Sequence, residues 1–189
     1  MHIGTKSLLF GAHQFLMHPV LAWVAWRRLY GKTPTFRQTI AIVIHDWGYW
    51  GSPNMDGEEG ERHPVWAYKW CLKRGWLAEA DLCLFHSRFY AKAEGRVPSE
   101  LCYADKLANA MVPARLYVFL TVASGELFEY LSAKKHESVR FSRNPHEFVL
   151  RFRGVVRKVL QESWHPGPRI YANNKWKIPH TPCADKLNA

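Results

Sequence analysis

Helix-start and helix-stop residues divide the first part of the chain, and they constrain its fold more than any other feature of the sequence. Residues 18–30 (HPVLAWVAWRRLY) have Pro19 at the first helical position and end at Gly31, which is the pattern of a capped helix. Thr33 and Pro34 open the next apolar segment, TFRQTIAIVIHD. Its β-branched run IAIVI is compatible with a buried strand, but its length and the threonine cap favour a helix.

The helical period continues through the rest of the chain. It predicts further helices at residues 63–74, 77–90, 98–111, 113–133 and 145–162. The last helix has Asn144 as its cap, Pro145 at its first position and Glu147 three residues after the cap. A Gly-, Pro- and Asp-rich loop, WGYWGSPNMDGEEGER, follows the second helix. No strand–turn–strand signal occurs, so we expect an all-α bundle of about six to eight helices.

Length and composition indicate one globular domain with a tail. The chain has 189 residues, of which 48% are hydrophobic and 22% charged, and this composition excludes intrinsic disorder. A chain of this length buries a core without disulfides. We expect a domain at residues 1–163, followed by an irregular, Pro- and Asn-rich tail at residues 164–189 that packs on the domain.

The cysteines and the longest uncharged stretch indicate the compartment. None of the four cysteines forms a CxxC pair with another, so we expect free thiols in a reducing compartment. Residues 8–26 carry no formal charge, but two histidines, a glutamine and a proline interrupt them, which is costly in hydrocarbon. We therefore expect no membrane span and a cytoplasmic location.

Six histidine and aspartate residues stand at or near the ends of the predicted helices, and we expect the bundle to bring them together. They are His18, His45, Asp46, His63, His86 and Asp105. Imidazole and carboxylate ligands suit first-row divalent metals. Six ligands are too many for a single tetrahedral ion and suit two ions that share a carboxylate and a bridging water. We expect two divalent ions, and the sequence leaves their identity open among Fe, Mn, Zn, Co, Ni and Mg.

Two of these ligands have competitors in the sequence. His13 and His18 are five residues apart and do not share a helix face; His18 opens a long helix and is favoured, with His13 as a supporting neighbour. Asp105 and Asp185 share the context ADKL, and Asp105 is favoured because it lies in a helical apolar pattern. The later histidines are expected at the surface: His136, His146, His165 and His180.

Cationic and aromatic residues near these ligands indicate a phosphorylated substrate. The cations are Arg62, Arg88, Lys92 and Lys106, whose guanidinium and ammonium groups suit phosphate. Arg88 and Lys92 turn toward the ligands only if the preceding helix ends near His86. Trp47, Tyr49 and Trp50 follow the His-Asp pair and are expected to line a pocket for a base or ring.

The order of the six ligands resembles the HD-domain superfamily of metal-dependent phosphohydrolases, whose pattern is H…HD…H…H…D. The resemblance covers residues 10–130 and is carried by IAIVIHDWGYWG, GERHPVWAYKW, LFHSRFYAK and YADKLANA. It implies an HD-domain-like helical bundle. It also implies a first ion held by His18, His45, Asp46 and Asp105. A second ion would be held by His63 and His86, with Asp46 as the bridge.

The resemblance further implies hydrolysis of a phosphoester or phosphoanhydride bond in a nucleotide-like substrate. Asp46 and Lys106 would be catalytic, and the substrate would be held by Arg62, Arg88, Lys92, Lys106 and Tyr49. Tyr49 stands where many phosphodiesterase members have a lysine, so that lysine's role has no counterpart here. The formal net charge of +10 favours a polyanionic partner and leaves nucleic acid as a further option.

Two other functions are also compatible with the sequence. The first is a di-iron oxygenase of the same superfamily acting on a small polar or phosphonate substrate, because such enzymes use six matching ligands. The spacing of 19 residues from His86 to Asp105 looks more like the phosphodiesterase members. The second is a catalytically idle binding module. It is disfavoured because a buried cluster of imidazoles and carboxylates without metal carries a desolvation cost.

Overall fold

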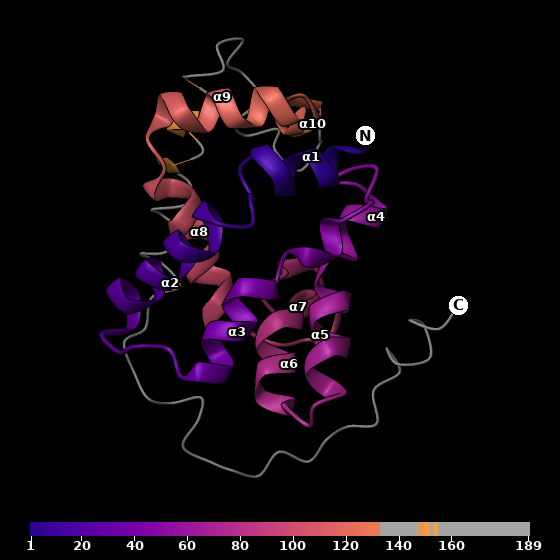
Figure 1. The fold of residues 1–189 in the computed structure, drawn as a ribbon, viewed down its shortest axis with the longest axis vertical. Coiled ribbons are helices and arrows are strands. Elements are labelled where there is room, and N and C mark those ends of the chain that lie inside the picture. Colours follow the sequence, from indigo (N-terminus) through magenta and orange to yellow (C-terminus); the bar gives the residue numbers. More distant parts are fainter. Residues whose placement is uncertain (133–146, 148, 152, 155–189) are drawn as a thin grey trace.

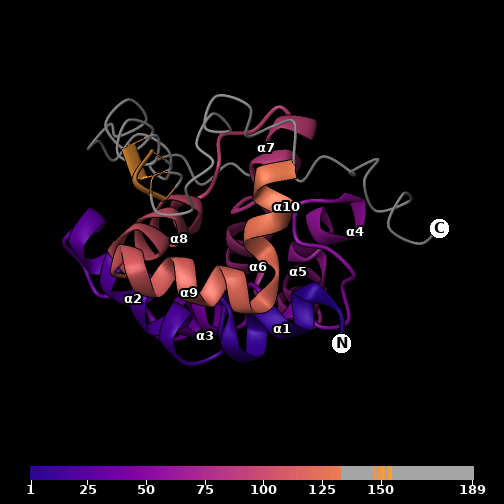
Figure 2. The same ribbon diagram turned by 90° about the horizontal axis from the view of Figure 1, so that it is seen from above.

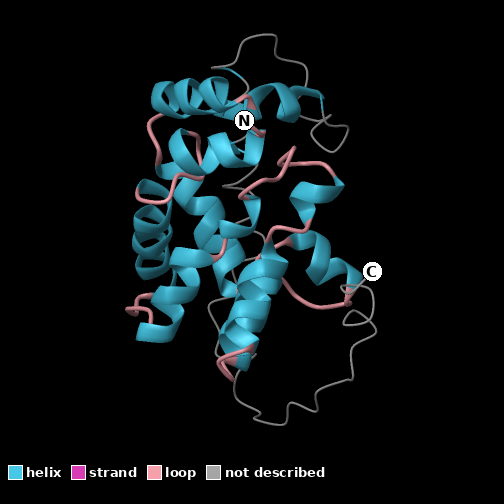
Figure 3. Ribbon diagram, turned by 45° about the vertical axis from the view of Figure 1, so that its right-hand side comes forward, coloured by secondary structure: helices cyan, strands magenta, loops and turns pink. Residues whose placement is uncertain are grey.

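The computed structural model describes residues 1–132, 147, 149–151, 153 and 154. This part of the chain is helical and contains no strand (Figure 3). Its elements are α1 (Ile3–Phe10), α2 (Met17–Tyr30), α3 (Phe36–Ile44), the 3-10 helix η1 (Trp47–Tyr49), α4 (Glu58–Glu61), α5 (Pro64–Leu72), α6 (Leu77–Leu84), α7 (Arg88–Ala93), α8 (Glu100–Met111), α9 (Ala114–Ser124) and α10 (Glu126–Ser132). The expected all-α fold is confirmed. Ten α-helices in this part exceed the expected six to eight, because two expected helices are divided and α1 and α4 are additional.

Two expected helices are each divided by a local backbone feature. Gly125 has a φ of 91°, a left-handed conformation that glycine adopts without strain, and it separates α9 from α10. The helix expected at residues 77–90 ends with α6. Ser87 then starts α7, because its side chain accepts a hydrogen bond from the N–H of Phe89. The unexpected helices α1 and α4 have no side-chain cap, so the sequence carried no start signal for them.

The helices α2 and α3 form where they were expected, but their starts differ from the prediction. α2 begins at Met17, so Pro19 is its third residue rather than its first. Gly31 ends α2 with a φ of 64°. α3 begins later than expected, because its N-cap is Thr35 rather than Thr33. The Thr35 hydroxyl accepts a hydrogen bond from the N–H of Gln38, whose side chain accepts one from the N–H of Thr35. The segment IAIVI lies in α3, so the strand alternative is wrong.

The helices pack around two main apolar clusters. The larger cluster joins α2, α3, α5, α6 and α8, and its largest buried side chains are those of Trp26, Ile42 and Leu101. The second cluster lies under α9 and α10 and includes Tyr117 and Leu127. Figure 1 shows α1, α9 and α10 at one end of the molecule and α5 and α6 toward the other, and Figure 2 shows α9 and α10 running in different directions. Full burial of each large apolar side chain contributes about 1.5–3 kcal/mol.

A close backbone approach fixes the segment after α3 against the start of α5. η1 packs on both α5 and α1. A side chain at Gly48 would overlap the backbone carbonyl of His63, so only glycine permits this approach. Asp46 immediately precedes η1 and His63 immediately precedes α5. The contact therefore holds these two predicted ligands beside each other.

Other predictions concern the thiols, the membrane and the C-terminal part. Cys71, Cys83 and Cys102 are buried free thiols, as expected. Among the described residues, no single helix is long and apolar enough to cross a membrane; α8 and α9 meet that requirement only together, as a pair bent by 104°. The few described residues of the helix expected at 145–162 are helical. The tail at 164–189, with Cys183 and Asp185, lies outside the described residues.

Candidate metal centre

All six predicted ligands meet at one place in the structure. His18 lies in the first turn of α2, His45 is the C-cap of α3, and Asp46 follows it. His63 and His86 stand before α5 and after α6. The expectation of helix-end positions is wrong for Asp105 alone, which lies in the middle of α8. It reaches the other ligands because α8 packs along α2.

The ligand atoms form two groups that share one residue. In each group the atoms lie within 4.8 Å of one another. The first group consists of His18, His45, Asp46 and Asp105, and the second of Asp46, His63 and His86. These are the two sets that the sequence resemblance implies. Five of the six side chains are buried, and Asp105 is partly buried.

The carboxylate of Asp46 divides its two oxygens between the groups. Oδ2 lies 3.3 Å from Nε2 of His18 and 3.2 Å from Nε2 of His45. Oδ1 lies 3.7 Å from Nε2 of His63 and 3.6 Å from Nε2 of His86. Each oxygen therefore faces a different pair of imidazoles, which is the arrangement of a carboxylate that bridges two cations.

Three of the histidines are fixed by the same local hydrogen bond. The Nδ1–H groups of His45, His63 and His86 each donate to the backbone carbonyl three residues earlier. A carbonyl only accepts, so Nδ1 carries the proton in each ring and Nε2 is left with a lone pair when the ring is neutral. An outer nitrogen held in this way is typical of histidines that bind metal.

The orientation of these lone pairs fits a cation. The Nε2 atoms of His63 and His86 are 3.0 Å apart, and two lone pairs at that distance repel unless a proton or a metal ion lies between them. His45 Nε2, Asp46 Oδ2 and both ring nitrogens of His18 are buried without a hydrogen-bond partner in the described part of the chain. Bonds of about 2.1 Å to one ion place neighbouring donor atoms about 3.0–3.4 Å apart. The donor set therefore fits divalent metal.

The electrostatics of the two groups differ. Burial lowers the pKa of His18, but its ion pairs with Asp105 and Asp46 outweigh burial and raise that pKa to about 9. Burial, reinforced by the neighbouring His86, lowers the pKa of His63 to about 3. Burial raises the pKa of Asp46, but His45, His18 and His86 together bring it well below its usual range. At neutral pH the first group holds a proton that metal must displace, whereas His63 holds none.

This difference gives a pH dependence for metal binding. Because the pKa of His18 is about 9, the proton is bound below that pH and competes with metal, so Mn²⁺ affinity should rise from pH 6.5 to 9 and level off above it. The rise is about tenfold per pH unit for each proton displaced. Calorimetry in buffers of different ionisation enthalpy counts the protons, and His18→Asn should release fewer of them than the wild type. An affinity that does not change with pH would contradict this result.

The predicted substrate-binding cations do not all lie at the centre. Lys106 is half-buried in α8 and interacts electrostatically with Asp105 and Arg88. Arg88 is exposed at the start of α7, after the helix break that the sequence argument required. Arg62 is exposed and paired with Glu58 at 2.7 Å, and Lys92 is exposed. Among the described contacts, none joins Arg62 or Lys92 to a ligand.

The predicted aromatic residues separate into two environments. Tyr49 is buried and stacks on the ring of His63, with centroids 3.9 Å apart. It is thus part of the packing that holds a ligand. Trp47 and Trp50 are exposed instead, and with Phe15 and Trp66 they line an apolar hollow of about 460 Å³.

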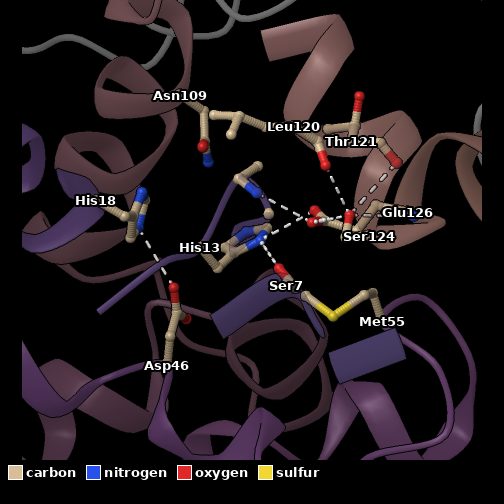
Figure 4. Close-up of polar contacts among 12 residues, drawn as sticks. Ser7, His13, His18, Asp46, Met55, Asn109, Leu120, Thr121, Ser124 and Glu126 are labelled. Carbon is tan, nitrogen blue, oxygen red and sulfur yellow. Dashed lines mark hydrogen bonds and ion pairs between the residues drawn. The ribbon is translucent and has the colours of Figure 1, made fainter. Parts of the chain in front are cut away.

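Sequence reasoning missed two partners of the site. Asn109 lies one turn after Asp105, and its amide donates to Oδ1 of that residue at 3.4 Å. The i, i+4 spacing in the predicted helix was the available signal. Glu126 is joined to His13 (Figure 4), and no sequence signal connects residues that are 113 positions apart.

No protein-family model, curated protein or solved structure matches this chain.

Proposed function

We propose that this protein is a metal-dependent phosphohydrolase of the kind that its sequence resembles. It hydrolyses a phosphoester or phosphoanhydride bond in a small, nucleotide-like molecule with two divalent ions. The observation that supports this proposal most is the division of the Asp46 oxygens between two groups of imidazoles. Bound divalent ions would supply Lewis-acid charge and lower the pKa of the attacking water.

The residues of this chain have separate tasks in that reaction. Asp46 holds the two groups at a fixed separation. Lys106 and Arg88 provide positive charge beside Asp105, where they bind the oxygens of a phosphoryl group. The buried imidazoles exclude bulk water on the protein side, which strengthens each of these interactions.

The net positive charge is distributed unevenly along the chain. Residues 1–132 contain 14 Lys and Arg against 12 Asp and Glu, whereas residues 133–189 contain 12 against 4. Most of the positive excess therefore lies after α10. Among the described residues, Lys106 and Arg88 are the predicted cations that lie near Asp105, so the proposal assigns the attraction of phosphate to them.

Removal of either local cation should weaken the reaction without loss of metal. Lys106→Gln and Arg88→Gln should each lower kcat/KM by about 10- to 150-fold, because a hydrogen bond to a charged group contributes about 1.5–3 kcal/mol. Metal content, measured by elemental analysis, should not change. The matched control is Arg28→Gln, an exposed arginine in the last turn of α2, at the opposite end of that helix from His18. Equal kcat/KM values for all three variants would contradict the assigned roles.

The proposed function is tested by phosphate release under anaerobic conditions. The purified protein, loaded with Mn²⁺, Zn²⁺ or Mg²⁺, is incubated with nucleoside mono-, di- and triphosphates and with cyclic nucleotides. We expect release of phosphate or of a nucleotide product without dioxygen. Turnover that requires iron and consumes oxygen stoichiometrically would instead establish the oxygenase alternative.

A further inference from the structure

A buried carboxylate outside the metal groups is fully satisfied by hydrogen bonds. Glu126 is 0% exposed. Its Oε1 accepts from the Ala12 N–H at 3.0 Å and the Ser124 hydroxyl at 2.7 Å. Its Oε2 accepts from the Tyr130 hydroxyl at 3.0 Å and from Nδ1–H of His13 at 3.2 Å. A side chain at Gly11 would overlap Oε1, so the chain folds closely around this group.

These contacts fix the tautomer and the orientation of His13. The carboxylate only accepts, so Nδ1 of His13 carries a proton, and the Ser7 hydroxyl lies 3.0 Å from the same nitrogen (Figure 4). When the ring is neutral, Nε2 carries the lone pair, and it has no partner among the described residues. A histidine whose Nδ1–H is held by a buried carboxylate presents Nε2 in a fixed direction.

His13 lies beside the metal groups without belonging to them. Its ring centroid is 5.3 Å from that of His18 and 5.6 Å from that of Tyr49. None of its atoms is in either ligand group. The side chain keeps 12% of its surface exposed, whereas His18 and His45 are almost completely buried. A polar ring that is held rigidly, keeps part of its surface exposed and packs against a ligand is suited to contact the substrate.

We propose that His13 contacts the reacting molecules and that Glu126 positions it. Nε2 of His13 accepts a hydrogen bond from an O–H group at the metal centre. The O–H group belongs either to the hydrolytic water or to a hydroxyl of the substrate. This proposal rests on the proposed function, because it assumes a hydrolytic reaction at the two groups.

Two variants distinguish the contact that His13 makes with the reacting molecules from the positioning of His13 by Glu126. They are His13→Asn and Glu126→Gln. The amide nitrogen of asparagine takes the place of Nδ1 and still donates to Glu126, but the variant lacks Nε2. Glu126→Gln keeps His13 but removes the strict acceptor that fixes its tautomer. His2→Asn is the matched control, because His2 is exposed and its side chain makes no cap hydrogen bond. His13→Ala, which also lacks Nε2, is the second variant if His13→Asn does not fold.

Two probes identify the source of the O–H group in the Mn²⁺-loaded protein. If His13 holds the water, His13→Asn should lower kcat about tenfold even on bis(p-nitrophenyl) phosphate, which has no hydroxyl group. If His13 holds a substrate hydroxyl, the loss should appear with adenosine 5′-monophosphate and be absent with its 2′,3′-dideoxy form. Metal content should be that of the wild type in both cases.

A spectroscopic readout tests the positioning role separately from activity. Nitrogen-15 imidazole spectra should show the His13 signal as the Nδ1–H form in the wild type, and this signal should become mixed in Glu126→Gln. Activity of His13→Asn and His13→Ala within twofold of His2→Asn on all probes, in an active wild type, would overturn the proposal for His13 alone. A wild type without phosphohydrolase activity would overturn the proposed function and this contact with it.

Discussion

Replacement of Asp46 by alanine should remove both metal ions from the protein. The two oxygens of this carboxylate face different imidazole pairs, so the variant loses a ligand from each group at once. Loss of an outer-shell partner alone lowers metal affinity about 10- to 100-fold, so loss of a shared ligand should exceed about 100-fold. Elemental analysis and calorimetry with Mn²⁺ measure the stoichiometry and the affinity. Hydrolysis should fall to background in the same variant.

Variants that change only the second ligand group test whether the loss of both ions is specific to Asp46. His63→Ala and His86→Ala affect only the second group and should retain one ion per chain. Asp81→Ala is the matched control. Asp81 lies on α6, is paired with Arg96 and belongs to neither group. Two ions in Asp46→Ala, or no more than one ion in the saturated wild type, would exclude the bridging role.

Replacement of Glu126 by alanine should strongly lower the free energy of unfolding. This change leaves the Ala12 N–H, the His13 Nδ1–H and the hydroxyls of Ser124 and Tyr130 without their common acceptor in a buried place. Removal of one partner from a buried charged network costs about 3–5 kcal/mol. Urea unfolding followed by circular dichroism, in the presence of a chelator, should show this fall in the free energy of unfolding.

An exposed glutamate provides the control for that measurement. The side chain of Glu58 is 81% exposed and is paired with Arg62. Because exposed ion pairs contribute about 0–1 kcal/mol, Glu58→Ala should leave the free energy of unfolding almost unchanged. A similar small effect for Glu126→Ala would mean that the network around Glu126 does not hold α10 and the α1–α2 connection together.

The ligand set shows how much of the candidate site could be predicted from the sequence. His18, His45, Asp46, His63 and His86 could be selected because each stands at or near a helix boundary, and such boundaries are set by caps, prolines and glycines within a few residues. The division into two groups followed from the resemblance, and the structure brings the same residues together. How the Asp46 oxygens are shared depends on the packing of η1 against α5, which is not a local property.

Most helices of the described part, and the residue types of the ligand set, were thus predictable from the sequence, because helical periodicity and capping depend on neighbours in the chain. The helices α1 and α4 carried no such local signal. The tertiary structure decided which side chains the helices present to one another. It stacked Tyr49 on His63, placed Arg88 near Lys106, and left Arg62 paired with Glu58 at the surface. It also joined His13 to Glu126, since a contact across 113 residues exists only when the helices between them have packed.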